Sequence, residues 1–274
     1  MSFTQNRKNG VVFDTADGLA ATGGIRHAFS TRIGGVSAPP CDTLNFARTA
    51  GDPEENLLEN FRRLGAAAGF DAQRLCCCRQ IHSDRVVTAS RAHAGRVRWD
   101  ERPWDADALV TNEPGLALAV FTADCCPILF YDPAAHAVGA AHAGWRGTAL
   151  GIAARTVEAM QRQYGSRPEN IRAAIGAAIG PCCFETDGDV PAAMRTSLGA
   201  AAEPLITRVG EKFHVDCKGL NRQWLLSCGL LPEHIELNGT CTGCTPSLYW
   251  SHRKMGLRRG GMCAAIALCE EASV

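Results

Sequence analysis

The sequence lacks the features that mark several common classes of protein. Its 274 residues contain 28 Lys and Arg against 28 Asp and Glu, so the net charge at neutral pH is zero. A balanced charge predicts no overall attraction to nucleic acid or to an anionic membrane, so any anion site must be a local group of cations. The first residues form no apolar run of signal-peptide length, and no segment approaches the roughly 18 uninterrupted apolar residues of a membrane span. These absences favour a soluble cytoplasmic protein without a nucleic-acid or membrane partner.

The chain also lacks repeats, low-complexity tracts and Pro/Ser-rich linkers, which predicts one domain over residues 1–274. Apolar runs bounded by turn residues predict strands, and apolar residues at helical spacing predict helices. Strands are expected at 27–30, 117–122, 128–131, 137–141 and 212–216, with helices after 52–55 and at 148–164, 190–198 and 220–228. Residues 248–268 are expected to form two strands around a glycine-rich turn. This irregular alternation predicts an α/β (α+β) fold, a single domain with a mixed β-sheet flanked by helices.

Cysteine, by contrast, is plentiful, with 14 residues. Disulfide scaffolds are usually short and secreted, and several of these cysteines are neighbours in sequence, at 76–78, 125–126 and 182–183. Most are therefore expected to be small buried hydrophobic residues kept reduced. Cys241 and Cys244 have CxxC spacing, but no second CxxC pair accompanies them, so this half motif predicts no metal site.

Three apolar runs end in polar clusters, at 80–84, 122–127 and 141–147. They contain His82, Cys125 and His142, and two imidazoles with one thiolate suit Zn²⁺ while leaving a fourth position open. Zinc lowers the pKa of bound water towards about 7 and so supplies hydroxide at neutral pH. Asp84 and Asp124 are near two of these residues in sequence and could orient the ligands or move protons. Spacing alone indicates this site weakly, because single buried His and Cys residues are commonly structural.

Seven segments occur in one order over nearly the whole chain: "HAFSTRIGGVS", "QIHSDRV", "DALVT", "TADCCPILF", "AAHAGWRG", "IGPCCFE" and "LNR". Together they closely resemble the YfiH/laccase-domain family, once called multicopper polyphenol oxidoreductases and also described as purine nucleoside phosphorylases. The resemblance implies a His–Cys–His metal site at His82, Cys125 and His142. It also implies a mixed α/β fold related to cysteine hydrolases of the cytotoxic necrotising factor type. The implied activity is phosphorolysis of adenosine, inosine and methylthioadenosine, with adenosine deamination as a second activity.

Two segments depart from the family pattern. The family's "EVG" is replaced by Glu185-Thr186-Asp187, with the glycine shifted to Gly188. The arginine expected directly before Met262 is missing, although Arg258 and Arg259 lie nearby. If that arginine contacts the substrate in relatives, the specificity of this chain differs from theirs.

Phosphorolysis requires an anion site, which a neutral chain must build from local cations. Arg32 is the first candidate, because Gly34 and Gly35 let a loop backbone approach an anion. Arg146 and Arg253 follow, since a guanidinium group can bind phosphate through two hydrogen bonds. The alternative for each is a surface salt bridge. The expected partners are thus purine nucleosides and phosphate, and the sequence predicts no oligomeric state.

Several other functions are weighed against this one. Multicopper oxidation requires about ten His, many in His-x-His pairs, whereas this chain has 8 His and no such pair. One Cu²⁺ could still occupy the zinc site, because Cu²⁺ binds more tightly than Zn²⁺. The signature of cytidine deaminases, which combines H-x-E with P-C-x-x-C, is absent. The main alternative is a cysteine hydrolase or amidase that edits cell-wall precursors, with Cys125 as nucleophile and His142 as base. A non-enzymatic binding module is the third.

Overall fold

Strands form three sheets in the structure, a computed structural model that describes residues 2–48 and 51–270. The first sheet contains, in spatial order, β1 (Phe3–Lys8), β2 (Val11–Ala16), β3 (Ile25–Ser30), β15 (Met262–Leu268), β7 (Ala117–Thr122) and β4 (Leu75–Cys76). The second contains β14 (Ile235–Leu237), β10 (Arg172–Ile175), β8 (Cys126–Asp132), β9 (Ala137–Ala143), β6 (Ala108–Thr111) and β5 (Val86–Thr88). A small third sheet contains β11 (Glu185–Thr186), β13 (Lys212–Val215) and β12 (Ile206–Val209).

Both large sheets are mixed. Most neighbouring strands are antiparallel, but β4 runs parallel to β7, β5 to β6 and β10 to β14. The expectation of a mixed α/β fold is confirmed in kind, yet two large sheets are present where the sequence predicted one. Hydrophobic runs identify strands, but they do not tell which strands share a sheet, because pairing depends on contacts distant in sequence.

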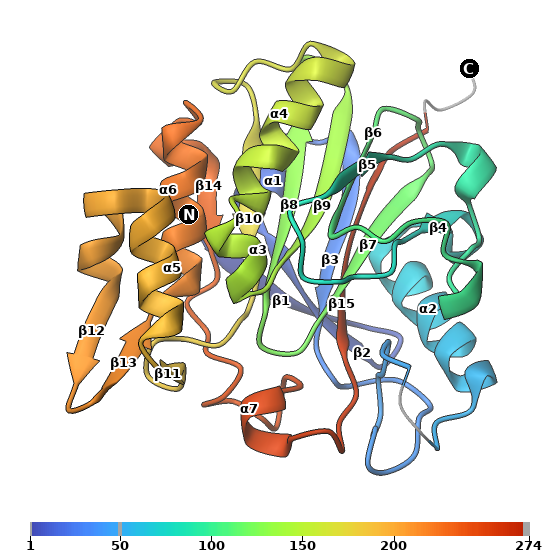
Figure 1. The fold of residues 1–274 in the computed structure, drawn as a ribbon. Coiled ribbons are helices and arrows are strands. Elements are labelled where there is room, and N and C mark those ends of the chain that lie inside the picture. The colour runs from blue at the N-terminus through green and yellow to red at the C-terminus, as the bar shows by residue number, and fades with distance from the viewer. Residues whose placement is uncertain (1, 49–50, 271–274) are drawn as a thin grey trace.

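Helices cover the outer faces of the two sheets (Figure 1). The helices are α1 (Asp17–Ala21), α2 (Glu54–Ala68), α3 (Trp145–Ala149), α4 (Ile152–Tyr164), α5 (Asp189–Leu198), α6 (Cys217–Ser227) and α7 (His252–Met255). Of these, α2 covers the first sheet and α4 and α6 cover the second, whereas Leu19 of α1 packs between the sheets. Short 3₁₀ turns lie at 72–74, 91–93, 99–101, 199–205 and 232–234. One hydrophobic cluster joins α2 to the first sheet, a second fills the space between the sheets, and a third joins α4 and α6 to the second sheet. The protein is therefore layered as helix, sheet, sheet, helix.

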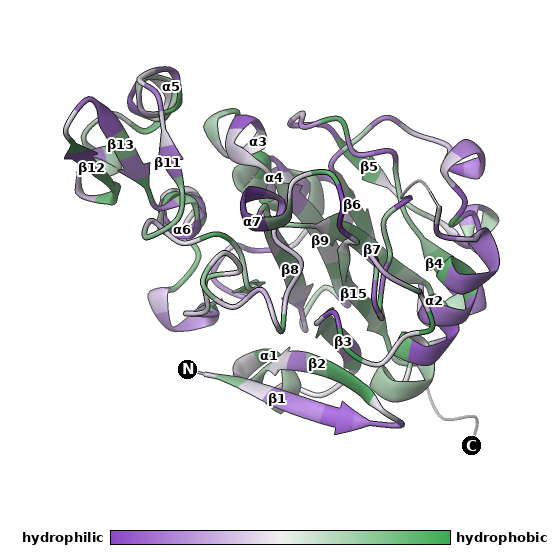
Figure 2. Ribbon diagram, turned by 90° about the horizontal axis from the view of Figure 1, so that it is seen from below, coloured by the Kyte–Doolittle hydropathy of each residue, from purple (hydrophilic) through white to green (hydrophobic). Residues whose placement is uncertain are grey.

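The strands fit this arrangement because successive side chains point to opposite faces. In β8, Cys126 and Ile128 belong to the cluster under α4 and α6, whereas Leu129 packs between the sheets. Every residue of β8 and β9 is buried, since both faces of these strands are covered. Figure 2 shows β8, β9 and β15 largely hydrophobic inside the molecule and the edge strand β1 hydrophilic. In the part of the chain that is described, no helix has both the length and the apolar character to cross a bilayer.

Two local predictions are wrong. The helix expected at 148–164 is two helices, α3 and α4, because Gly151 adopts a left-handed conformation with φ 79° between them. Residues 248–268 contain one strand, β15, and the short helix α7 in place of a second strand. The side chain of Ser251 caps α7 by accepting a hydrogen bond from the N–H of Lys254, which favours a helical turn there.

Candidate metal centre

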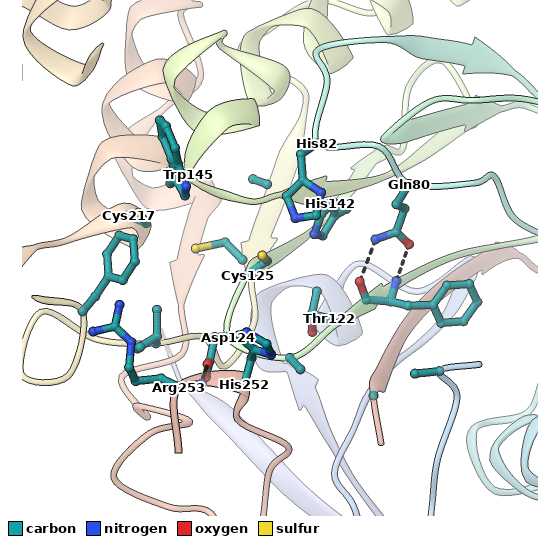
Figure 3. Close-up of a pocket in the computed structure, with 18 of the residues that line it drawn as sticks. Gln80, His82, Thr122, Asp124, Cys125, His142, Trp145, Cys217, His252 and Arg253 are labelled. Atoms are coloured by element: carbon teal, nitrogen blue, oxygen red, sulfur yellow. Dashed lines mark hydrogen bonds between the residues drawn. The ribbon is translucent and has the colours of Figure 1, made fainter. Parts of the chain in front are cut away.

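Three separate segments bring His82, Cys125 and His142 together. His82 lies in the loop between β4 and β5, Cys125 lies directly before β8, and His142 lies in β9. One potential ligand atom from each residue lies within 4.8 Å of those of the other two. The two imidazole rings meet edge to face, with their centroids 4.9 Å apart. The three side chains point toward a common position (Figure 3), as the sequence predicted.

Two bends in the backbone direct these side chains. His82 and Asp124 have φ values of 61° and 86°. Residues other than glycine seldom adopt such backbone angles, and those that do are often found at functional sites. Asp124 is held in place because its carboxylate accepts hydrogen bonds from Thr242 Oγ1 at 2.5 Å and from the N–H of Arg253 at 2.7 Å. The N–H of His82 donates to a buried carboxylate at 3.0 Å. One bend lies at His82 itself and the other directly before Cys125, where the two side chains approach each other.

Asp107 is the carboxylate that connects the two histidine segments. It is fully buried, and Oδ1 receives the N–H of His82 at 3.0 Å and contacts Nδ1 of His142 at 2.8 Å. Oδ2 receives the N–H and the hydroxyl of Ser83 at 2.6 and 2.7 Å. Burial acts to raise the pKa of Asp107, but the hydrogen bonds from His142 and Ser83 outweigh it and lower the pKa. The ionised acid holds the Nδ1 proton of His142 and leaves Nε2 as the ligand atom.

The acids expected to orient the ligands were Asp84 and Asp124, and their positions differ from that expectation. Asp84 lies near the surface, where its carboxylate is 3.5 Å from Arg155. Asp124 is buried beside Cys125 but accepts its hydrogen bonds from Thr242 and Arg253. Sequence reasoning missed Asp107, although a signal was present: this acid directly precedes the apolar run Ala108-Leu109-Val110, which begins strand β6. An acid beside such a strand is buried and must find hydrogen-bond donors.

The donor set fits a metal ion. Burial by itself raises the pKa of the Cys125 thiol, but the charges and hydrogen bonds of His142 and His82 lower it, so the thiolate is favoured. Burial likewise opposes protonation of His142, whereas the neighbouring thiolate and Asp107 raise its pKa, so a metal ion would displace the proton from Nε2 when it binds. A Cβ atom at Gly144 would lie 2.7 Å from the ring of His82 and 3.2 Å from Sγ of Cys125, so glycine allows the ligands to converge. Two nitrogens and one thiolate with an open side suit Zn²⁺.

A cavity of about 460 Å³ opens beside these three residues. Its wall includes the aromatic side chains of Trp145 and Phe184, the imidazole of His252 and the guanidinium groups of Arg253 and Arg259. Gln80 orders another part of the wall, because its side-chain amide donates to the carbonyl of Phe121 and accepts the N–H of the same residue (Figure 3). The cavity thus combines flat apolar surfaces with cations close to the candidate metal ligands.

Of the three arginines expected to bind an anion, Arg253 alone lines this cavity. The guanidinium of Arg32 donates to the carbonyls of Asp42 and Pro246 at 2.9 and 2.8 Å and lies 3.9 Å from the ring centroid of Trp250. Its positive charge therefore ties the glycine-rich loop to the 246–250 segment. Arg146 is exposed, and its guanidinium stacks on Trp145 at 4.2 Å.

Arg259 enters the cavity from the segment in which the expected arginine before Met262 is missing. The Arg259 guanidinium donates to the carbonyl of Gly260 at 2.8 Å. Gly260 and Gly261 have no room for side chains, since a Cβ atom there would lie 2.7 Å from Asn45 and 2.9 Å from Ala47. This close packing brings Arg259 to the cavity wall. Arg259 lies three residues before Met262, so its guanidinium group reaches the cavity from close to the position where the arginine was expected.

Comparisons with known proteins agree with this architecture. Residues 26–269 match the family described as multi-copper polyphenol oxidoreductase laccase. The purine nucleoside phosphorylase of Deinococcus radiodurans is 40% identical over 244 residues, which are 89% of each chain. The purine nucleoside phosphorylase YfiH of Escherichia coli K12 is 37% identical over 231 residues, 84% of this chain and 89% of that protein.

A solved structure shows the same fold. The crystal structure of YlmD from Geobacillus stearothermophilus superposes with a TM-score of 0.91 at 34% identity, and it covers 98% of this chain and 99% of that one. Such agreement over nearly the full length means that the two chains share the arrangement of both large sheets. The chain therefore belongs to the multi-copper polyphenol oxidoreductase laccase family, the YfiH-like group in which relatives are named purine nucleoside phosphorylases.

Proposed function

We propose that this protein is a zinc-dependent purine nucleoside phosphorylase that acts on adenosine, inosine and methylthioadenosine, with adenosine deamination as a side activity. The observation that carries the proposal is the convergence of His82, Cys125 and His142 in the wall of a cavity that also contains two arginines. The names of the relatives support the reaction class. Cu²⁺ is the alternative occupant of the same site, because it binds such ligands more tightly than Zn²⁺.

In this reaction an oxygen of phosphate forms a bond to C1′ of the sugar, the bond from C1′ to the purine nitrogen breaks, and the base takes up a proton. A metal ion held by His82, Cys125 and His142 would act as a Lewis acid beside the reacting groups. Arg253 and Arg259 place positive charge for the phosphate. His252 lines the same cavity and offers an imidazole outside the ligand set to protonate the departing base.

The remaining wall fits a purine. Trp145 and Phe184 provide flat apolar surfaces for the base. Within the described residues, the hydrogen bonds of the Arg253 guanidinium join Nη1 to the carbonyls of Cys183 and Glu185, so Nε and Nη2 remain for an anion. Arg253 is itself positioned because Asp124 accepts its backbone N–H at 2.7 Å. Asp124 thus acts on the anion site through Arg253.

One arrangement favours a second candidate, the cysteine hydrolase or amidase that edits cell-wall precursors. Cys125, His142 and Asp107 follow one another as nucleophile, base and orienting acid, with Nδ1 of His142 2.8 Å from Asp107. The lowered pKa of the Cys125 thiol, which burial opposes and the neighbouring histidines cause, suits a nucleophile as well as a metal ligand. The likeness to hydrolases of the cytotoxic necrotising factor type belongs to this candidate.

Product analysis on protein of measured metal content distinguishes the two. With adenosine or inosine, the proposal predicts free base plus ribose 1-phosphate, formed only when phosphate is present. Cys125→Ala should abolish this reaction and lower metal content, whereas Cys126→Ala should leave both nearly unchanged, because Cys126 lies in the core under α4 and α6. Base release that does not depend on phosphate would contradict phosphorolysis. Inactivation by a thiol reagent that spares bound metal, with an acyl group trapped on Cys125, would establish the hydrolase.

A further inference from the structure

A second group of potential metal ligands lies outside the candidate centre. Cys182 and Cys183 occupy the turn that follows β10, and Cys241 and Cys244 occupy the turn that follows β14. The four sulfur atoms all lie within 4.8 Å of one another. Sγ of Cys244 is 3.5 Å from Sγ of Cys182 and 3.5 Å from Sγ of Cys183. The CxxC pair that lacked a partner in the sequence therefore meets its second pair through the parallel contact of β10 and β14.

These distances match those of a tetrathiolate site. Zn–S bonds of about 2.3 Å at tetrahedral angles place the sulfur atoms about 3.8 Å apart. Sulfur atoms that all lie within 4.8 Å of one another, two pairs of them at 3.5 Å, need only small side-chain movements to reach that spacing. Because Cys244 is equally close to two thiols, the arrangement favours four ligands around one point over a single disulfide.

The surrounding backbone is shaped to the sulfur atoms. The N–H of Gly180 donates to Sγ of Cys241 at 3.1 Å, a contact that stabilises a metal-bound thiolate. A Cβ atom at Gly180 would lie 3.3 Å from Sγ of Cys182, and one at Gly243 would lie 3.0 Å from Sγ of Cys183. Side chains at these two glycines would therefore push the thiols apart. Both turns are built so that the four sulfur atoms can approach one another.

We propose that Cys182, Cys183, Cys241 and Cys244 bind a structural Zn²⁺ ion, separate from the centre at His82, Cys125 and His142. Four thiolates complete a tetrahedral shell and leave no position open for a substrate, which is the arrangement of structural zinc sites. Cys182 and Cys244 are exposed, so the metal can enter from solvent. A bound metal ion would also explain why these two thiols are exposed, because free cysteine is among the most buried residue types.

This ion would join two walls of the candidate active site. Thr242, between two of the ligands, donates a hydrogen bond to Asp124, the residue before Cys125. Arg253 donates to the carbonyls of Cys183 and Glu185 at 3.4 and 2.9 Å. The zinc site therefore holds the partners of both Asp124 and Arg253. This positioning role rests on the proposed function, whereas metal binding itself does not.

Cobalt substitution in the full-length chain tests the binding. The background is Cys125→Ser, which removes the thiolate of the first centre, and the protein is stripped of metal under reducing conditions and titrated with Co²⁺. We expect one equivalent of tetrahedral cobalt with intense sulfur-to-cobalt charge-transfer absorption, displaced by one equivalent of Zn²⁺ because zinc binds more tightly. Adding Cys244→Ser should abolish this spectrum. Adding Cys269→Ser, a half-buried cysteine outside both groups, should leave it unchanged.

Further measurements keep the test decisive. If the Cys244→Ser protein does not fold, zinc content decides: two ions per wild-type chain and one in Cys125→Ser are expected. The single variant Cys244→Ser, in which Cys125 is intact, should show a raised nucleoside KM while it retains the ion at the first centre. The proposal is overturned if the reduced Cys125→Ser protein gives no cobalt charge-transfer band. It is also overturned if the mass of the freshly isolated protein shows a disulfide between Cys244 and Cys182 or Cys183. None of the metal readouts depends on whether the protein turns over nucleosides.

Discussion

Replacing Asp107 with asparagine tests how the candidate centre is organised. The change keeps the size of the side chain and removes its negative charge. Oδ2 receives two backbone N–H groups, from Ser83 at 2.6 Å and Ile81 at 3.3 Å, so the oxygen of the introduced amide should take this side. The amide NH₂ then faces the N–H of His82 and Nδ1 of His142. At each of these two contacts a hydrogen-bond donor therefore faces another donor, with no acceptor between them.

Two effects of different size follow from this orientation. The N–H of His82 loses its buried acceptor, which costs about 1–3 kcal/mol of unfolding free energy. His142 can relieve the second conflict only if Nδ1 accepts a hydrogen bond from the amide N–H, which places the ring proton on Nε2. A protonated Nε2 cannot bind a metal ion, so metal affinity should fall by about 10- to 100-fold, as for other groups that orient ligands. Phosphorolysis should fall at least as far as metal occupancy.

The assay is a Zn²⁺ titration against a chromophoric chelator, combined with urea unfolding of the metal-stripped protein. Asp84→Asn is the matched control, because Asp84 is close to His82 in sequence but pairs with Arg155 near the surface. This control should change unfolding free energy by less than about 0.5 kcal/mol and leave zinc affinity unchanged. Equal zinc affinity in wild-type and Asp107→Asn protein would refute the proposed orientation of His142. A loss of affinity in Asp84→Asn alone would restore the role first expected for that acid.

Three further predictions concern the cations and the acid limit of stability. Arg253→Ala and Arg259→Ala should each raise KM for phosphate more than KM for nucleoside in steady-state kinetics, and equal effects on both would argue against an anion site. Arg32→Ala should lower unfolding free energy by about 2 kcal/mol in urea without a selective effect on phosphate, since its guanidinium binds two partly buried carbonyls and stacks on Trp250. Burial lowers the pKa of His27 to about 4, so the neutral ring contributes stability that is complete above its unfolded pKa of about 6.5 and is lost as pH falls toward 4. In urea unfolding, the fall in unfolding free energy between pH 7 and pH 4 should be smaller in His27→Gln than in the wild-type protein, by up to about 3 kcal/mol. An unchanged pH profile would refute this prediction.

Much of the centre was readable in the sequence. His82, Cys125 and His142 each sit where an apolar run meets a polar cluster, and strand ends are where such side chains gather. The separation of Cys125 from Cys126 also follows from the alternation of a strand, which places Cys126 in the core beneath α4 and α6. These features depend on local periodicity and on motifs, which a sequence carries directly.

Direction and distant pairing were not readable there. Arg32 and Arg253 are the same residue type in the sequence, but Arg32 stacks on Trp250, whereas Arg253 lines the cavity. A motif identifies a residue without telling which way a long side chain turns, because its partners come from other segments.

Some features were determined by the sequence alone: its apolar periodicity predicted the core strands β7, β8 and β9 and the helices α2, α5 and α6, and its motifs predicted the three candidate ligands. Only the tertiary structure decided which acid meets His142 and which thiols meet Cys241 and Cys244. Asp107 reaches His142 because β6 pairs with β9, and the cysteine pairs meet because β10 lies parallel to β14. The physical reason is that strand pairing joins residues 35 or 62 positions apart, as between Asp107 and His142 or Cys182 and Cys244, and no local pattern records that register.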